Sequence, residues 1–410
     1  MKRLFTMNHI NLFVGLAGYL ALTGTLAAQE GESLEEILQR IPEPAPGFTQ
    51  APLPEEPRIY ETGEGMDIEV AVIARGLNHP WSLVSLPDGT LLVTERNNGQ
   101  LRAIRNGVLD PQPIKGLPEV KGGGFAGLND VVLHPDFTSN RLVYLSYLKP
   151  FADDKSAIAV ARGEFDGSSL LDTRDIFIAD EGVGGSSRLM FDSHGALFVT
   201  FYGSREEVQN TGNLNGKIIR LTDDGSVPAD NPFTGTPGAR PEIYTLGHRT
   251  PQGLVEHPVT GEIWSMEMGP NGGDEINILK PGANYGWPYI SLGRDYAGEW
   301  QGAFQREGFE DPVAYWMPSI SVSGMVFYTG NKLTAWRGDL LVAGLRTGEI
   351  PGTGVVQRIR FNDQHEEIRR ETLFADLHTR FRGVYQDKEG YLYVLIDQDD
   401  GAVLRIGPAE

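Results

Sequence analysis

The chain has no cysteine among its 410 residues. It therefore contains neither a disulfide nor an N-terminal cysteine that could carry a lipid, and an exported form must be held together by its packed core alone. Of the oxidising compartments, a bacterial periplasm fits this composition best.

Positive charge is also scarce. The sequence has 35 lysines and arginines against 55 aspartates and glutamates, and its formal net charge is −20. No basic cluster is present to release counterions from a polyanion, which argues against nucleic acid and anionic membranes as partners. Arginines that stand in unusual loops are therefore informative.

Long amphipathic helices are missing after residue 66, and so are several catalytic signatures. No G-x-G-x-x-G follows a strand to open a helix, so a nicotinamide domain has no support. Neither H-E-x-x-H nor G-x-S-x-G occurs, so zinc protease and serine hydrolase functions have no basis either.

Residues 1–28 have the form of a secretory signal peptide. Lys2 and Arg3 precede an apolar run over residues 10–26, which closes with Ala27 and Ala28. A transmembrane anchor is the alternative, but the run is short for a bilayer and contains several glycines. We expect cleavage near Ala28, a periplasmic or secreted protein, and no membrane span after cleavage.

Residues 29–65 are rich in proline and acids. This composition predicts an extended linker with one short helix over residues 34–40.

Residues 66–408 contain six related segments. Each has an apolar strand, a turn with Pro, Asp or Gly, a second apolar strand and usually a third. The segments begin at Trp81, Leu128, Ser187, Gln252, Ser323 and Arg382. One such sheet cannot bury both of its faces, so the units must stack on one another, and closing them into a ring also protects their edges.

The repeat therefore predicts an all-β fold, a six-bladed β-propeller. Residues 67–77 are expected to supply the strand that closes the ring with the last unit. A pair of β-sandwiches is the alternative, but the spacing of the units exceeds the hairpin rhythm of a sandwich.

The loops of a propeller gather at the two ends of its channel, where residues distant in sequence can converge on one ligand. Four loops, at residues 247–253, 268–275, 343–349 and 379–383, contain arginine or clustered turn formers. Five arginines stand at matching repeat positions: Arg188, Arg249, Arg346, Arg380 and Arg382. Each alone could simply pair with a surface acid, but guanidinium groups bind carboxylates bidentately, so a ring of them suits a small polyanionic ligand.

Residues 266–288, MEMGPNGGDEINILKPGANYGWP, pack turn formers densely between two strand-like stretches. Together with GLNHPWSL, VVLHPDF, HRTPQG and RFRG, this stretch resembles the soluble pyrroloquinoline quinone (PQQ)-dependent sugar dehydrogenases, the glucose/sorbosone and aldose sugar dehydrogenase family. The resemblance covers residues 68–407. It implies a propeller that holds PQQ and Ca²⁺ at the channel mouth and oxidises the anomeric hydroxyl of a sugar to a lactone.

The resemblance also implies residue roles. Arg249 matches the arginine that polarises the reactive quinone carbonyl and is the predicted catalytic residue. The other predicted cofactor-binding residues are Thr250, Gln252, Ser319, Arg346, Arg380 and Arg382. Main-chain carbonyls of Gly269 and Pro270 match the ligands of the Ca²⁺ beside the quinone, and Glu275 with the carbonyl of Tyr285 matches a second, structural Ca²⁺ site.

The chain departs from the family pattern on the catalytic side. Gly184 stands where the family has a histidine base, four residues before the arginine of an H-x-x-G-R-L stretch. Phe125 replaces a glutamine, Ser204 an aspartate, and Thr250 the asparagine of HRNPQG. Either a carboxylate acts as base, the candidates being Asp180, Glu181, Glu206 and Glu207, or the protein binds a ligand without oxidising it.

Three functions therefore remain open. The first is a PQQ- and calcium-dependent dehydrogenase of a sugar or related alcohol, with an unidentified electron acceptor. The second is a catalytically degenerate propeller that binds a carbohydrate or a protein. The third, supported by the fold alone, is a calcium-dependent lactonase.

Overall fold

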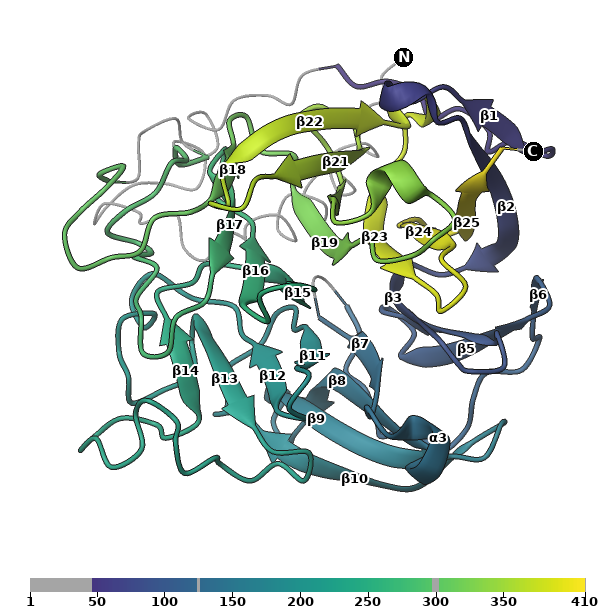
Figure 1. Cartoon of the computed structure of the whole chain (residues 1–410). Helices are drawn as coiled ribbons and strands as arrows, with labels where there is room; N and C mark the ends of the chain where they lie inside the picture. The colour runs from purple at the N-terminus through teal and green to yellow at the C-terminus, as the bar shows by residue number, and fades with distance from the viewer. Residues whose placement is uncertain (1–45, 124–125, 297–301, 410) are drawn as a thin grey trace, which may run out of the picture.

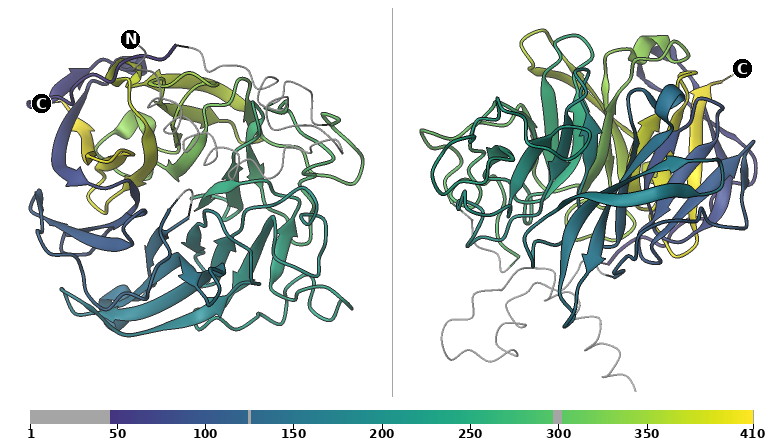
Figure 2. Two further views of the ribbon diagram at one scale, coloured as in Figure 1. Left: turned by 180° about the vertical axis from the view of Figure 1, so that it is seen from behind. Right: turned by 90° about the horizontal axis from the view of Figure 1, so that it is seen from below.

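A computed structural model describes residues 46–123, 126–296 and 302–409, and it confirms the all-β, six-bladed propeller. Six sheets surround a central channel (Figure 1), and the same ring is seen from behind in Figure 2. The predicted signal peptide and the predicted helix at residues 34–40 lie outside the described residues.

Each blade is a sheet of antiparallel strands that runs from the channel outward, with the first strand innermost. The first blade contains β3 (Pro80–Ser85), β4 (Leu91–Glu95), β5 (Gln100–Arg105) and β6 (Val108–Leu109). The second contains β7 (Leu128–Leu133), β8 (Leu142–Pro150), β9 (Ser156–Phe165) and β10 (Leu170–Ile178). The third contains β11 (Leu189–Phe191), β12 (Leu197–Thr200), β13 (Lys217–Leu221) and β14 (Ile243–Leu246).

The fourth blade contains β15 (Pro251–Glu256), β16 (Ile263–Glu267), β17 (Asp274–Ile278) and β18 (Ala314–Trp316). The fifth contains β19 (Val322–Phe327), β20 (Leu340–Gly344), β21 (Val355–Phe361) and β22 (Glu367–Leu373). The helical elements among the described residues are α3 (Phe137–Asn140), η1 (Gly63–Gly65), η2 (Thr334–Trp336) and η3 (Ala375–Leu377). No helix in the described ranges is long and apolar enough to cross a membrane.

The last blade closes the ring as expected. Its strands β23 (Phe381–Gln386), β24 (Leu392–Ile396) and β25 (Gly401–Pro408) come from the C-terminus, and β2 (Ile68–Leu77) pairs antiparallel with β25. A further strand, β1 (Arg58–Tyr60), pairs with β2 and lies inside the range predicted as a linker. Joining the two ends of the chain in one sheet leaves no gap in the ring and protects strand edges.

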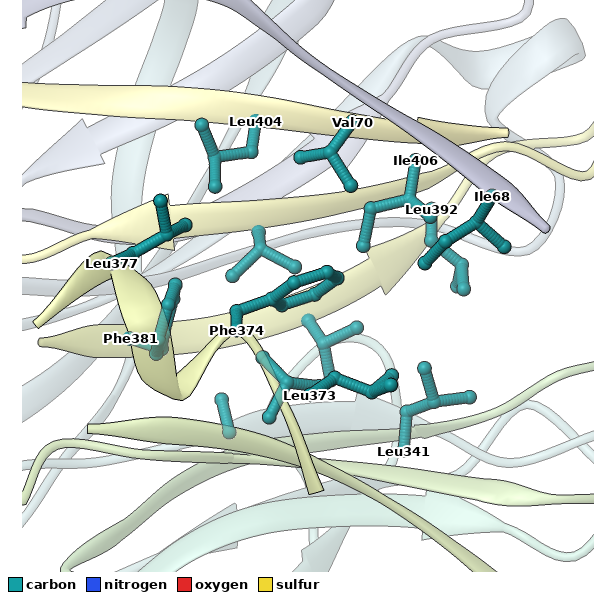
Figure 3. Close-up of a cluster of buried hydrophobic side chains, with 14 of the residues drawn as sticks. Ile68, Val70, Leu341, Leu373, Phe374, Leu377, Phe381, Leu392, Leu404 and Ile406 are labelled. Carbon is teal, nitrogen blue, oxygen red and sulfur yellow. The ribbon is translucent and has the colours of Figure 1, made fainter. Parts of the chain in front are cut away.

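The hydrophobic core lies between neighbouring blades. One cluster joins Ile68 and Val70 of β2 to Leu341 of β20, with the Phe374 ring packed between them (Figure 3). All of these side chains are buried. Burying a Val, Leu, Ile or Phe side chain contributes about 1.5–3 kcal/mol. Without disulfides, these contacts between blades hold the ring together.

Candidate functional site at one end of the channel

The loops before each innermost strand and those between the second and third strands emerge at the same end of the channel, because successive strands of a blade alternate in direction. Hydrogen bonds connect these loops. Asp397, after β24 of the last blade, bonds to His79, before β3 of the first blade. Within the fifth blade, the backbone N–H of Gly348, after β20, donates to the carbonyl of Ser319, before β19. The predicted site residues lie in these loops or in the strand ends beside them.

Inner strands carry an irregularity close to this end. In the pairing of β3, β15, β19 and β23, one residue falls outside the regular register: Trp81, Gln252, Ser323 and Arg382, respectively. The register of β7 shifts around Asn129 and Asp130. A bulge leaves a residue unpaired and redirects its side chain, and bulges are frequent next to active sites. Gln252 and Arg382, both predicted to bind the cofactor, occupy such positions.

Buried polar atoms without a hydrogen-bond partner gather at the level of these bulges in the channel. Within the described residues they include Gln252 Oε1, Arg382 Nη1, Trp81 Nε1 and both side-chain polar atoms of Asn129. All four residues are at most 2% exposed. Because buried polar groups are normally paired with protein, water or ligand, this level of the channel is suited to hold a polar guest.

Arg188 crosses the channel just below this level. Its guanidinium donates to the carbonyls of Gln252 (2.9 Å), Ser323 (2.5 Å) and Trp81 (3.4 Å), donates to Tyr385 Oη (3.4 Å), and lies 3.6 Å from Asp130 Oδ1. These partners belong to the five other blades. Glycines let the inner strands β19 and β23 approach each other closely, since a Cβ on Gly324 would lie only 2.9 Å from Gly383 Cα. Arg188 therefore binds the blades to each other.

A cavity of about 300 Å³ lies in the channel, lined by the innermost strands of all six blades. Its lining runs from Arg188 toward the other end of the channel, as far as Ser85 and Lys388.

The main cationic cluster surrounds Asp397. Its Oδ2 accepts from Arg382 Nε (3.1 Å) and Nη2 (2.5 Å) and from Arg380 Nη2 (3.3 Å), while Oδ1 bonds to His79 Nδ1 (2.7 Å). Burial alone would raise the pKa of the Asp397 carboxyl, but the Arg382 guanidinium and the bond with His79 hold that pKa well below its usual value. Burial lowers the pKa of Arg382 to about 9, and Asp397 opposes this, so Arg382 is charged at neutral pH.

Arg249 belongs to a second group of loops. Its Nη1 donates to the carbonyls of Gly269 (2.8 Å) and Met268 (3.1 Å) and to Thr250 Oγ1 (3.4 Å), and its guanidinium lies 5.4 Å from the centre of the Trp287 ring. Its backbone N–H donates to Glu267. The structure thus places Arg249, Thr250 and Gly269 together, as expected.

The backbone path at residues 268–273 depends on glycine and on Asp274. A Cβ on Gly269 would lie 2.2 Å from the Gly272 carbonyl oxygen, so no larger residue fits. The Asp274 carboxylate accepts from the N–H of Gly269 (3.0 Å) and from Ser319 Oγ (2.8 Å). Burial raises the pKa of Asp274 to about 6, against the effect of these hydrogen bonds. The Ser319 hydroxyl, predicted to touch the cofactor, is therefore engaged in holding two loops together.

Glu275 and Tyr285, predicted to share a metal site, line a cavity of about 20 Å³ together with Glu267 and Trp287. Burial, and then the neighbouring Glu267 carboxylate, raise the pKa of Glu275 to about 8. Its nearest hydrogen-bond partner is Asn277 Nδ2 (2.9 Å). Two carboxylates beside a carbonyl-rich turn form an oxygen-donor set of the kind that Ca²⁺ prefers. Within the described residues, no group of three or more His, Asp or Glu side chains is arranged to hold a metal ion.

The idea that five arginines occupy matching repeat positions is wrong. Arg188, Arg249 and Arg380 precede innermost strands, Arg382 lies within one, and Arg346 follows the second strand of its blade. Arg346 pairs with Glu349 (3.0 Å), and its backbone N–H donates to the carbonyl of Ile320. These arginines nevertheless lie at one end of the channel, because the loops before the innermost strands and the loops after the second strands both emerge there.

Three of the four carboxylates considered as bases have other partners. Asp180 pairs with Arg240, Glu181 with Lys155 (2.6 Å), and Glu207 accepts from Asn210 and Asn213. Glu206 is exposed, and Ser204 lies in the same loop after β12. Phe125 lies outside the described residues.

Sequence reasoning missed Arg96, Asp397 and the part played by His79. Arg96 and Asp397 each directly follow the second strand of a blade, β4 and β24 respectively. The sequence repeat could have indicated this shared position. The residues around Arg96 and Asp397 gave no indication that the two side chains would lie close together.

The fold and the site define the class of protein as a six-bladed β-propeller with a cationic cluster at one channel end. A model of glucose/sorbosone dehydrogenases matches residues 77–405. The chain belongs to the glucose/sorbosone dehydrogenase family.

Individual proteins of known sequence are similar to this chain over most of their length. The aldose sugar dehydrogenase YliI of Escherichia coli is 37% identical, over 83% of this chain and 93% of its own length. Quinoprotein glucose dehydrogenase B of Acinetobacter calcoaceticus is 26% identical, over 86% of this chain and 91% of its own. An uncharacterized protein of Synechocystis, slr1608, is 36% identical over 83% and 86%.

Solved structures are similar as well. The apo form of the E. coli aldose sugar dehydrogenase has a TM-score of 0.78 and 36% identity, with 83% of this chain and 100% of that chain covered. The PQQ-bound aldose sugar dehydrogenase of Streptomyces coelicolor has a TM-score of 0.66 and 26% identity, with 83% and 98% covered.

Proposed function

We propose that the protein binds PQQ and Ca²⁺ at this channel end and oxidises a hydroxyl of an aldose or related alcohol to a lactone or carbonyl product. The observation that carries the proposal is the excess of positive charge around Asp397. Arg380 and Arg382 share that one buried carboxylate, while His79 bonds both to it and to the exposed Asp399. Arg382 Nη1 has no partner in the described part of the chain. An acidic, planar ligand would complete this set.

The residues present fit such a ligand. Arg380 and Arg382 would face its carboxylates, with Gln252 beside them, and Arg346 would approach from the neighbouring blade. Arg249, held over Trp287, would place its guanidinium where negative charge develops during reduction. When bound, PQQ supplies the two-electron acceptor for oxidation of the sugar hydroxyl.

Ca²⁺ would be held by the carbonyls of Gly269 and Pro270. Both residues are buried, and the Gly269 carbonyl already faces the Arg249 guanidinium. The turn is fixed by Asp274, so this carbonyl is oriented before a ligand arrives. Glu275 and the carbonyl of Tyr285 would hold a second, structural Ca²⁺.

Calcium is expected to stabilise the fold. At a free Ca²⁺ concentration near 100 times Kd, binding adds about 2.7 kcal/mol to the free energy of unfolding. Thermal unfolding with Ca²⁺, with Mg²⁺ and with EGTA measures this effect. Glu275→Gln should lose much of the Ca²⁺-dependent gain, whereas Glu389→Gln, in an exposed turn at the other end of the channel, should keep it. An equal gain in both variants would exclude Glu275 as a ligand.

Cofactor binding tests the proposal itself. The apoprotein is titrated with PQQ in the presence of Ca²⁺, following PQQ absorbance and tryptophan fluorescence, and dye reduction is then measured with a panel of aldoses. Arg249→Ala should weaken PQQ binding about 10-fold or more, because a charged hydrogen bond is lost, while the exposed Arg337→Ala should not. Failure of the wild-type protein to bind PQQ would refute the proposal.

One observation favours a second candidate, a propeller that binds its ligand without turnover. Gly184 supplies no base, and three of the four carboxylates considered as replacements are engaged with other partners. PQQ binding without dye reduction would support this candidate. We place the protein in the periplasm on the strength of its signal-like N-terminus, and N-terminal sequencing of the exported protein tests that assignment.

A further inference from the structure

Arg96 lies at the same channel end and takes no part in the predicted site. It directly follows β4 and is only 7% exposed. Its guanidinium lies 5.2 Å from the centre of the Trp81 ring, which Arg382 also approaches, at 4.1 Å. The Arg188 guanidinium lies 5.4 Å from the same ring centre, so three guanidinium groups from three blades surround one indole.

The hydrogen bonds of Arg96 are incomplete. Its side chain donates from Nε to Asn97 Oδ1 (3.0 Å), and no other side-chain hydrogen bond of Arg96 occurs in the described ranges. A guanidinium carries five N–H donors in a rigid fork. With respect to the part of the chain that the structure describes, the terminal nitrogens of Arg96 are thus available to a ligand.

The charges that act on Arg96 are those of the cluster around Asp397. Burial lowers the pKa of Arg96, while Asp397 raises it and Arg380 lowers it further, so all three charges act on one another. Arg96, Arg380 and Arg382 together place three positive charges beside one buried carboxylate. The nearby Glu95 does not balance them, because it pairs with Arg102 at 3.3 Å.

We propose that Arg96 is a ligand-binding residue that grips a carboxylate of the acidic cofactor, with Trp81 as the surface that orients its guanidinium. This inference rests on the proposed function and extends it to the first blade. A carboxylate would pair with the free edge of the fork and offset the excess charge. Without such a ligand, the cation cluster remains unbalanced.

The test compares two probes on three proteins. PQQ and its uncharged trimethyl ester are titrated by calorimetry into the wild type, Arg96→Met and the control Arg337→Met, in Ca²⁺ buffer. We expect Arg96→Met to weaken PQQ binding about 10-fold or more and to leave ester binding nearly unchanged. The PQQ affinity of Arg96→Lys, which keeps the charge and the packing on Trp81, should fall between the affinities of the wild type and of Arg96→Met.

The outcomes separate the two proposals. If the wild type binds PQQ and Arg96→Met binds it equally well, the role of Arg96 is refuted and the proposed function stands. If Arg96→Met and Arg96→Lys weaken PQQ and the ester alike, Arg96 acts through packing, which also refutes the role. If the wild type does not bind PQQ, both proposals fall.

Discussion

Replacing Arg188 by methionine should lower the free energy of unfolding by about 3–5 kcal/mol, the range measured when one partner of a buried ion pair is removed. The substitution leaves the Asp130 carboxylate unpaired, with both side chains of the pair only 6–7% exposed. It also removes donors from the carbonyls of Gln252 and Ser323. Urea-induced unfolding followed by tryptophan fluorescence measures the change.

Two further variants make the interpretation specific. The exposed Arg337→Met should shift the stability by less than about 0.5 kcal/mol, as surface substitutions do. Asp130→Asn combined with Arg188→Met should recover part of the loss, because no charge is then left buried. An unchanged urea midpoint for Arg188→Met would show that the blades do not depend on this residue.

Replacing Gly184 by histidine should raise turnover of the PQQ-loaded protein by about 10²–10⁴-fold, the usual contribution of a general base. The position accepts a side chain, because a Cβ there would meet only Leu148 Cδ1, at 3.8 Å, and its φ lies outside the left-handed region. Two residues on, Ser186 Oγ accepts from Gln252 Nε2 (2.5 Å), so the segment adjoins the proposed cofactor site.

The pH profile identifies the cause. A neutral imidazole takes up the hydroxyl proton, so the rate of Gly184→His should rise with pH through about 6.5. Gly184→Ala, which makes the same backbone change without an imidazole, should behave as the wild type. Fast turnover by the wild type, with no gain in the variant, would mean that another group serves as base.

Much of the fold followed from local patterns. The apolar strands with turn residues between them recur six times, and a repeat of this kind has few ways to bury its sheets. Residues 67–77 were assigned to the closing position, and β2 occupies it. The loops with Arg249 and Gly269 were also predicted together, and the structure joins them through a hydrogen bond.

The details of the site did not follow from such patterns. The side chains of Trp81, Gln252 and Arg382 come from bulges, which depend on pairing with a second strand and leave no signature in one strand alone. Arg96 and Asp397 are separated by most of the chain, and each resembles an ordinary surface charge in the sequence. Ser319 was assigned to the cofactor, but its hydroxyl bonds to Asp274.

The sequence by itself determined the repeat, the all-β class and the chemical character of the loops, because hydrophobic periodicity and turn chemistry act over a few residues. Only the tertiary structure decided which charges share Asp397 and that Arg188 reaches all the other blades. Those contacts join residues from different blades, and their geometry exists only after the ring has closed.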